Sequence, residues 1–220
     1  ILAYFIMCSV SYASDVYIEQ SGATLTANIN QDGQTNKFGD STTAVTLTGD
    51  TQTLDIDQVG STNTIAASVV GSTQEVTLNQ TGSSNTSTLS VGGFSSADDN
   101  SIIQTLTGGS NTTTVNVGNS ASSGDADVDL TVTGDSNTVT INENSTATMI
   151  GSDKKVTSIT AIGGSNTITS THTGAADQDT ILHHTGSTST FSITQGGAYD
   201  GTVDMTTVGS GHDVTITMDD

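Results

Sequence analysis

The string Gln58-Val59-Gly60-Ser61-Thr62-Asn63 follows a pattern, Gln-x-Gly-x-x-Asn, that recurs along the chain. The full pattern occurs three times and its Gly-x-x-Asn half three times more, and degraded copies end in Ser189 and His212. Successive copies lie 27, 22, 26, 26, 29, 23 and 23 residues apart. A period of this size indicates stacked supersecondary units. The predicted turn and ladder residues are Gln31, Gly33, Asn36, Gln58, Gly60, Asn63, Gln80, Gly82, Asn85, Gly108, Asn111, Gly134, Asn137, Gly163 and Asn166.

A weaker turn lies between the strong ones, at Gly49 and Gly71, so each unit is predicted to be strand, turn, strand, turn. We expect glycine at these turns to supply the positive φ of a tight reversal. Between turns, the aliphatic residues share one parity, as Leu54 and Ile56 do, and the opposite parity is mostly Thr, Ser, Asp and Asn. Such alternation is typical of half-buried strands.

One unit of this length cannot bury its own apolar stripe, but stacked copies can. We therefore predict an all-β fold, a β-solenoid of about eight coils with strands paired in parallel about 4.8 Å apart. Inward Gln and Asn should form ladders along the stack. Insertions at 92–99, 118–127 and 144–155 are expected to bulge out as loops. At 156–162 the sequence allows either parity.

The composition excludes several classes of protein. Only 32% of the 220 residues are hydrophobic and the net charge is −20, which would suggest disorder, but the regular alternation argues against it. The only basic residues are Lys37, Lys154 and Lys155. Nucleic-acid binding needs more cations than these, so it is excluded, and anionic membrane surfaces are unfavourable partners for the same reason.

The first residues differ from the rest. Residues 1–10 are apolar, and Ser11-Tyr12-Ala13 is a small-x-small cleavage pattern. Together they predict a truncated secretory signal peptide at 1–13, followed by the repeats at 14–220. The run is too short for stable membrane insertion. A lipoprotein anchor through Cys8 is the rival interpretation. Cleavage after Ala13 would leave an exported chain without cysteine.

The three full copies resemble the curlin repeat, the unit of curli fibres on bacterial surfaces, which has the form Ser-x5-Gln-x-Gly-x-x-Asn-x-Ala-x3-Gln. They match its Gln-Gly-Asn centre, while Gln52 and Gln74 hold the leading Ser position and Val69 and Val91 the final Gln position. The resemblance implies a subunit that associates end to end into an extracellular cross-β fibre. It also implies outer-membrane secretion and nucleation partners.

Three patterns in the sequence allow either a binding site or a structural role. Acidic clusters suggest calcium, but Asp and Asn also serve turns and solubility. Outward Thr-x-Thr pairs suggest ice binding, although unequal coil lengths and mixed neighbours predict an irregular face. His183 and His184 should point to opposite faces, which disfavours a metal site. The residues weighed are Asp98, Asp99, Asn100, Asp125, Asp127 and Asp129 for calcium; Thr46, Thr48, Thr86, Thr88, Thr131, Thr133, Thr138, Thr140, Thr215 and Thr217 for ice; and His172, His183, His184 and His212 for a metal.

The sequence thus predicts a secreted structural subunit of a bacterial surface or biofilm fibre. The alternative is a monomeric secreted β-solenoid that acts as a binding module, adhesin-like or ice-binding. We expect neither enzyme activity nor a cofactor or metal, because no catalytic constellation is legible among the many Ser, Asp and Gly residues. His184 and His212 stand where the repeat has Gln and Asn, which predicts that they substitute in the ladders.

Overall fold

The computed structural model of this chain describes residues 15–16, 18–33, 35–39, 44–60, 62–92, 99–118, 126–144, 154–174, 177–197 and 201–219. The signal peptide predicted at 1–13 lies outside these residues, as do 93–98, 119–125 and 145–153, which make up most of the three predicted insertion loops. The described residues contain no helix that is long and apolar enough to cross a membrane.

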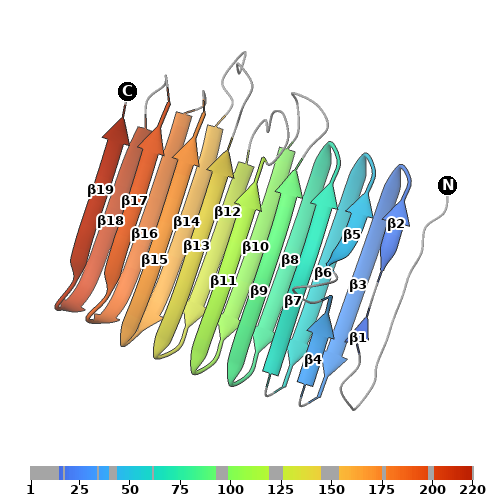
Figure 1. The fold of residues 1–220 in the computed structure, drawn as a ribbon, viewed down its shortest axis with the longest axis horizontal. Coiled ribbons are helices and arrows are strands. Elements are labelled where there is room, and N and C mark those ends of the chain that lie inside the picture. Colours follow the sequence, from blue (N-terminus) through green and yellow to red (C-terminus); the bar gives the residue numbers. More distant parts are fainter. Residues whose placement is uncertain are drawn as a thin grey trace.

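Every regular element in the described part of the chain is a strand (Figure 1). The strands are β1 (Asp15–Val16), β2 (Glu19–Ser21), β3 (Thr24–Asp32), β4 (Thr35–Phe38), β5 (Val45–Thr48), β6 (Thr51–Val59), β7 (Thr62–Val70), β8 (Thr73–Thr81), β9 (Ser84–Gly92), β10 (Asp99–Thr107), β11 (Ser110–Val117), β12 (Ala126–Thr133), β13 (Ser136–Asn144), β14 (Lys154–Gly163), β15 (Ser165–Thr173), β16 (Asp177–Ser187), β17 (Thr190–Gly196), β18 (Gly201–Ser210) and β19 (Asp213–Asp219).

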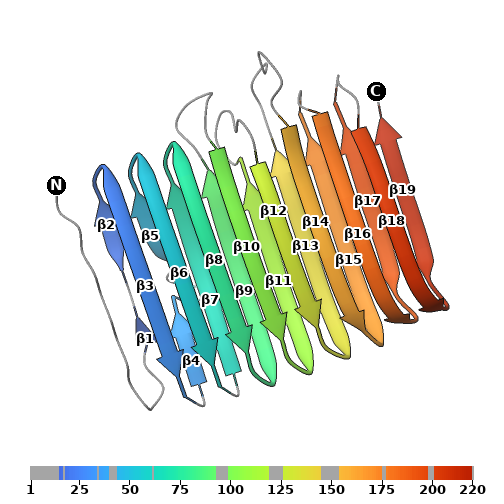
Figure 2. The ribbon, with the colours of Figure 1, turned by 180° about the vertical axis from the view of Figure 1, so that it is seen from behind.

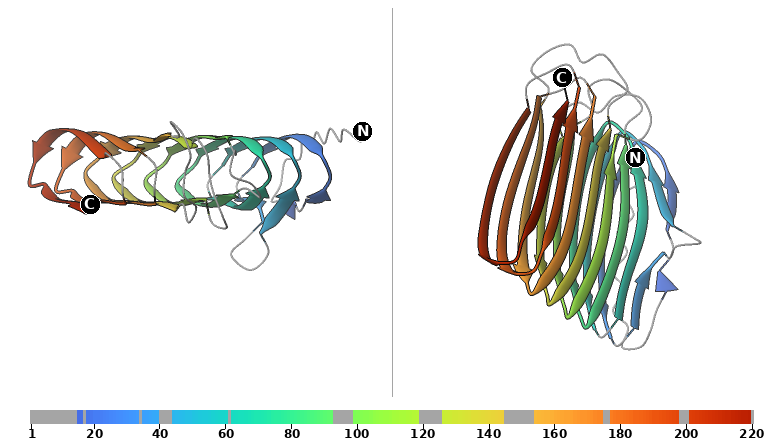
Figure 3. Two further views of the ribbon diagram at one scale, coloured as in Figure 1. Left: turned by 90° about the horizontal axis from the view of Figure 1, so that it is seen from above. Right: turned by 60° about the vertical axis from the view of Figure 1, so that its left-hand side comes forward.

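The strands form two parallel sheets, and the chain alternates between them. Sheet A runs β1-β4-β7-β9-β11-β13-β15-β17-β19, with β2 and β5 beside it, and sheet B runs β3-β6-β8-β10-β12-β14-β16-β18. Figures 1 and 2 show the strands side by side along the long axis, and Figure 3, left, shows the two layers edge on. The predicted class, an all-β solenoid with parallel stacking, is confirmed.

The predicted number of coils, eight, is slightly too high, since the solenoid has about six turns. Six coils, from β6–β7 to β16–β17, have a neighbour on both sides in both sheets. The coil before them is incomplete, because β4 and β5 pair with separate halves of β7. The coil after them, β18–β19, is stacked on one side only within the described residues.

Alternate side chains point into the narrow space between the sheets, and burial follows the predicted parity. In β6, Gln52, Leu54, Ile56 and Gln58 are buried, and the residues between them are partly exposed. Equivalent residues stand directly above one another, so that Leu54 pairs with Val76 and Ile56 with Leu78. Each coil therefore buries its apolar stripe against the stripes of its neighbours.

Register with its neighbours decides the frame of β14, which the sequence left open. Lys155, Thr157, Ile159 and Ala161 point inward, while Ile162 is exposed. Ile159 pairs with Leu130 on one side and with Leu182 on the other, which keeps an aliphatic column continuous. This frame also buries Lys155 near the start of the strand.

Most of the differences in coil length fall at one junction. From each strand of sheet B to the next strand of sheet A, the inward residues before and after the turn are always five apart, as in Gln58 to Asn63 and Ala161 to Asn166. The long insertions stand instead after β9, β11 and β13, before the next strand of sheet B begins, whereas the first coil has its extra residues between β4 and β5. The strands of both sheets consequently keep their register despite the insertions.

Candidate functional site

The first candidate feature is the inward Gln ladder. Gln31, Gln58 and Gln80 are buried in one column of sheet B. Gln58 Nε2 donates to Gln31 Oε1 at 2.6 Å, and Gln80 Nε2 donates to Gln58 Oε1 at 2.9 Å. The next residue of the column is Leu106, and Gln80 Oε1 has no partner there. The ladder thus spans three coils and stops where the Gln pattern stops in the sequence.

The inward Asn column runs further, along sheet A. Its members are buried, and each Nδ2 donates to backbone carbonyls at the turn, as Asn63 does to Gln58 O at 2.9 Å. From the third copy onward the side chains also bond directly to one another. The column begins with Asn36 and Asn63, which precede the directly bonded members. The direct bonds run from Asn85 to Asn111 (2.6 Å), from Asn111 to Asn137 (2.8 Å) and from Asn137 to Asn166 (2.7 Å).

Most of the turn glycines are required for a different reason from the one predicted, although Gly163 has the expected positive φ of 153°. Gly33, Gly60, Gly82, Gly108 and Gly134 do not have a positive φ. Instead, a Cβ at Gly60 would lie 1.6 Å from Gly33 O, and one at Gly108 would lie 2.3 Å from Gly82 O. The prediction that φ selects glycine was wrong at these five turns. The residue is selected because successive turns stack with their backbones in contact.

Histidine replaces the repeat residue late in both columns, as predicted, and in the Gln column Thr207 follows it at the edge. His184 pairs with Ala161 in the Gln column, and His212 directly precedes Asp213, which pairs with Thr190. His184 Nε2 lies 2.8 Å from Asn166 Nδ2 and 3.0 Å from Ser189 Oγ, so the imidazole closes the Asn ladder. Burial and the charge of His212 lower the pKa of His184. A neutral ring with Nε2 as acceptor fits both contacts.

A buried polar cluster between coils was not predicted from the sequence. Glu143 and His172 are adjacent in sheet A, and His172 Nδ1 donates to Glu143 Oε2 at 2.9 Å. Thr157 Oγ1 donates to Glu143 Oε1 at 2.5 Å, and His172 Nε2 lies 2.7 Å from Ser170 Oγ. The parity of β13 and β15 is the signal that places these side chains inside.

This cluster has the residue types of an acid–base–nucleophile triad, but its environment opposes catalysis. Glu143, His172 and Ser170 are 0% exposed, so no substrate reaches them. Lys155 is also fully buried, and its Nζ has no hydrogen-bond partner. Burial lowers the pKa of Lys155, and the charge of Glu143 opposes that shift. The carboxylate of Glu143 therefore offsets only part of the cost of burying this ammonium group.

The acidic and histidine residues that were candidate metal ligands are dispersed over the structure. Asp127 and Asp129 lie on the exposed outer face of β12, and Asp98 and Asp125 are outside the described residues. His183 points outward and His184 inward, as alternation predicts. Among the residues that the structure describes, no three His, Cys, Asp or Glu side chains gather where they would hold a metal ion.

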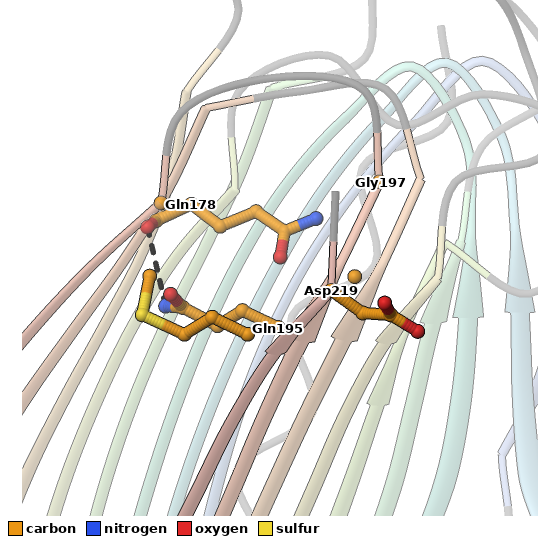
Figure 4. Close-up of a pocket in the computed structure, with 7 residues that line it drawn as sticks. Gln178, Gln195, Gly197 and Asp219 are labelled. Carbon is orange, nitrogen blue, oxygen red and sulfur yellow. Dashed lines mark hydrogen bonds between the residues drawn. The ribbon is translucent and has the colours of Figure 1, made fainter.

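A small hollow opens at the C-terminal end of the solenoid (Figure 4). Gln195 Nε2 donates to Gln178 O at 3.2 Å beside it, and Gly197, Met218 and Asp219 complete the rim. Its volume of about 20 Å³ is that of roughly one water molecule. It therefore has no room for an organic ligand.

Comparison with known proteins adds no assignment. No family model, no curated protein and no solved structure matches this chain. Two extended features of the solenoid meet solvent, namely its C-terminal edge and the outer faces of its sheets.

The C-terminal edge exposes residues that belong to core columns. Val214 pairs with the buried Phe191, and Ile216 with the buried Ile193, yet they are 44% and 45% exposed. Met218 is 53% exposed. Figure 3, right, brings this end forward, with β18 and β19 as its outermost strands. The edge thus combines open backbone groups with an apolar stripe that one more coil would bury.

Proposed function

We propose that this chain is a secreted structural subunit that associates end to end into an extracellular fibre at a bacterial surface or in a biofilm matrix. The observation that carries the proposal is the edge formed by β18 and β19, where Val214, Ile216 and Met218 are exposed in columns buried elsewhere. An open parallel edge with an apolar stripe is a template for another coil. The likeness of the turns to the curlin repeat supports the same proposal.

The two ends of the solenoid are compatible in register and size. In sheet B, the inward residues Val203 and Met205 of β18 stand at the end of the columns that begin with Ala27 and Ile29 of β3. A second copy placed at this end would continue both columns. Such head-to-tail contacts do not close, so they generate a filament rather than a dimer.

The short strands β1 and β2 add a step to this assembly. They pair with β4 and β5, on the side of sheet A where β19 of another copy would pair. Because they are only two and three residues long, they form few backbone hydrogen bonds. In the proposed contact β19 displaces them, and β18 then pairs with β3. Secretion and nucleation by outer-membrane partners belong to the same proposal.

Electron microscopy and fibre diffraction of the purified chain, followed over several days, test the proposal. Unbranched fibres with a meridional reflection near about 4.7–4.8 Å are expected. Ile216→Lys places a charge in the column that the next copy would bury, and it should abolish fibres without unfolding the exposed edge. Thr215→Lys, on the outward face of the same strand, is the matched control. A wild-type chain that stays monomeric overturns the proposal.

A further inference from the structure

The outward face of sheet A carries a regular array of threonine. Its first column holds threonine in six successive coils, because each outward residue pairs in register with the next. These residues are Thr64, Thr86, Thr112, Thr138, Thr167 and Thr190. The expectation of an irregular face was therefore wrong on this sheet, since the insertions fall between strands and leave the register intact.

A second column runs beside the first, two residues further along each strand. It consists of Thr88, Thr114, Thr140, Thr169, Ser192 and Thr215. In four successive coils both columns hold threonine, so β9, β11, β13 and β15 each present a Thr-x-Thr pair. A third column of Ser, Asn and Thr flanks these two, and Asn142 Nδ2 donates to Asn116 Oδ1 within it at 2.9 Å.

The same face excludes charge. No outward position of β7, β9, β11, β13, β15 or β17 holds Asp, Glu, Lys or Arg, although the chain has a net charge of −20. In the same coils the outward face of sheet B carries Asp55, Asp57, Glu75, Asp127, Asp129, Asp177 and Asp179. Solubility would be served by acids on both faces. The segregation indicates that sheet A meets an uncharged surface.

The geometry of the array specifies that surface further. Strand pairing repeats the hydroxyl and methyl groups about every 4.8 Å along the solenoid and about every 6.6 Å along a strand. Threonine is stiff at χ1, so the groups stay in place. The repeat along the solenoid is close to a repeat distance of the ice lattice. The face carries no aromatic side chain on β7 to β17, such as a sugar-stacking site would use.

We propose that the outward face of sheet A binds ice, with the two threonine columns ordering water into the crystal lattice. This activity needs only a folded solenoid, so it does not depend on whether the chain forms fibres. A fibre would present many copies of the face at once and would increase the avidity. The fibre proposal concerns the end of the solenoid and the ice-binding proposal concerns its side. An experiment can therefore contradict either proposal without contradicting the other.

The test measures thermal hysteresis and inhibition of ice recrystallisation with the purified chain. The wild type should show both activities. Thr138→Tyr, in the middle of the first column, should abolish them by lifting the flat face off the lattice, whereas Thr131→Tyr, exposed on sheet B, should retain them. Thr138→Ser keeps the hydroxyl and the fold and removes one methyl group, and it should weaken the activity partially.

Three outcomes overturn the proposal. The first is a folded wild-type chain that leaves ice growth unchanged. The second is an equal loss in Thr138→Tyr and Thr131→Tyr, since these residues lie on opposite sheets. The third is a lateral dimer, found by sedimentation and dissolved by Thr138→Tyr, which would assign the face to contacts between copies instead. Circular dichroism confirms that each variant retains its β structure.

Discussion

His172 Nδ1 lies 2.9 Å from Glu143 Oε2, and both side chains are completely buried between the sheets. The two residues pair in register in adjacent coils, β13 and β15, so the contact joins one coil to the next. Thr157 and Thr180 complete the cluster from sheet B, with Thr180 Oγ1 at 3.1 Å from His172 Nε2. Neighbouring coils are thus held together by specific polar contacts as well as by apolar burial.

We predict that His172→Ala destabilises the solenoid by about 3–5 kcal/mol, because it leaves the buried carboxylate of Glu143 without its partner. The free energy of unfolding from urea titration measures the effect. The double variant Glu143→Leu, His172→Leu should cost less than the single change, since the buried carboxylate is removed together with its partner. His183→Ala, exposed on β16, is the control and should change stability by at most about 0.5 kcal/mol. Equal effects of His172→Ala and His183→Ala would contradict the prediction.

Lys155→Met should stabilise the chain at pH 7 by about 1 kcal/mol or more, because it removes a buried ammonium group that has no hydrogen-bond acceptor. The pKa of Lys155 is lowered in the folded state, so the wild type loses stability as the pH falls through that lowered pKa. The advantage of the variant should therefore shrink toward pH 10.5, the ordinary pKa of lysine. Thermal melts at pH 7 and at pH 10.5 check this, with Lys37→Met, at a partly exposed position of β4, as the control.

The stacked turns offer a matched pair of adjacent glycines. Gly108→Ala should destabilise by about 1–3 kcal/mol, because its Cβ would lie 2.3 Å from Gly82 O in the turn below. Gly109→Ala should be neutral or stabilising by up to about 1 kcal/mol, since its nearest contact would be 3.5 Å, to Ser83 O. Urea titrations of the two variants measure the change in the free energy of unfolding. Equal costs would mean that backbone conformation, and not axial stacking, selects the glycine.

The histidine at the end of the Asn ladder predicts acid sensitivity. Because burial and His212 lower the pKa of His184, the stability that its neutral form provides is fully present above about pH 6.5 and is lost as the pH falls through the lowered pKa. His184→Gln restores the residue of the column and keeps an acceptor for Asn166, so it should remove this loss. Melting temperatures of the wild type and of His184→Gln between pH 7 and pH 5 measure this loss of stability. His183→Gln, which is exposed, should melt like the wild type at each pH.

Periodicity predicted most of the fold, because both the turn and the alternation repeat in register. Gln58, Asn63 and their equivalents are buried in columns, as the parity required. The sequence did not decide the frame of β14, since Val156 and Ile162 compete with Ile159 and only the neighbouring strands fix the register. It also gave the wrong reason for Gly60, because a contact between coils cannot be inferred from one turn alone.

The polar cluster was missed, and the regularity of the threonine array was wrongly predicted, for related reasons. Glu143 and His172 lie 29 residues apart, and their contact depends on the length of an intervening insertion that is absorbed outside the strands. The same absorption aligns Thr112 with Thr138, which unequal spacing had suggested would be out of register. Coil length in the sequence therefore describes the loops, while the register of the strands is set by backbone pairing and by the stacked turns.

Finally, we predict that fibre assembly is faster at about pH 4–5 than at pH 7, because protonation of carboxylates reduces the repulsion between chains of net charge −20. The environment of Asp55 also favours faster assembly at low pH. Burial and the neighbouring Asp57 and Glu75 raise the pKa of Asp55. The stability that its protonated form provides is therefore fully present below pH 3.8 and is lost as the pH rises through the raised pKa. Light scattering at constant protein concentration follows the rate, and added salt or calcium at pH 7 should produce a similar acceleration. Asp55→Asn should assemble faster than the wild type at pH 7 and at the same rate at pH 4. If the rate is the same under all these conditions, charge repulsion does not limit the joining of one solenoid to the next.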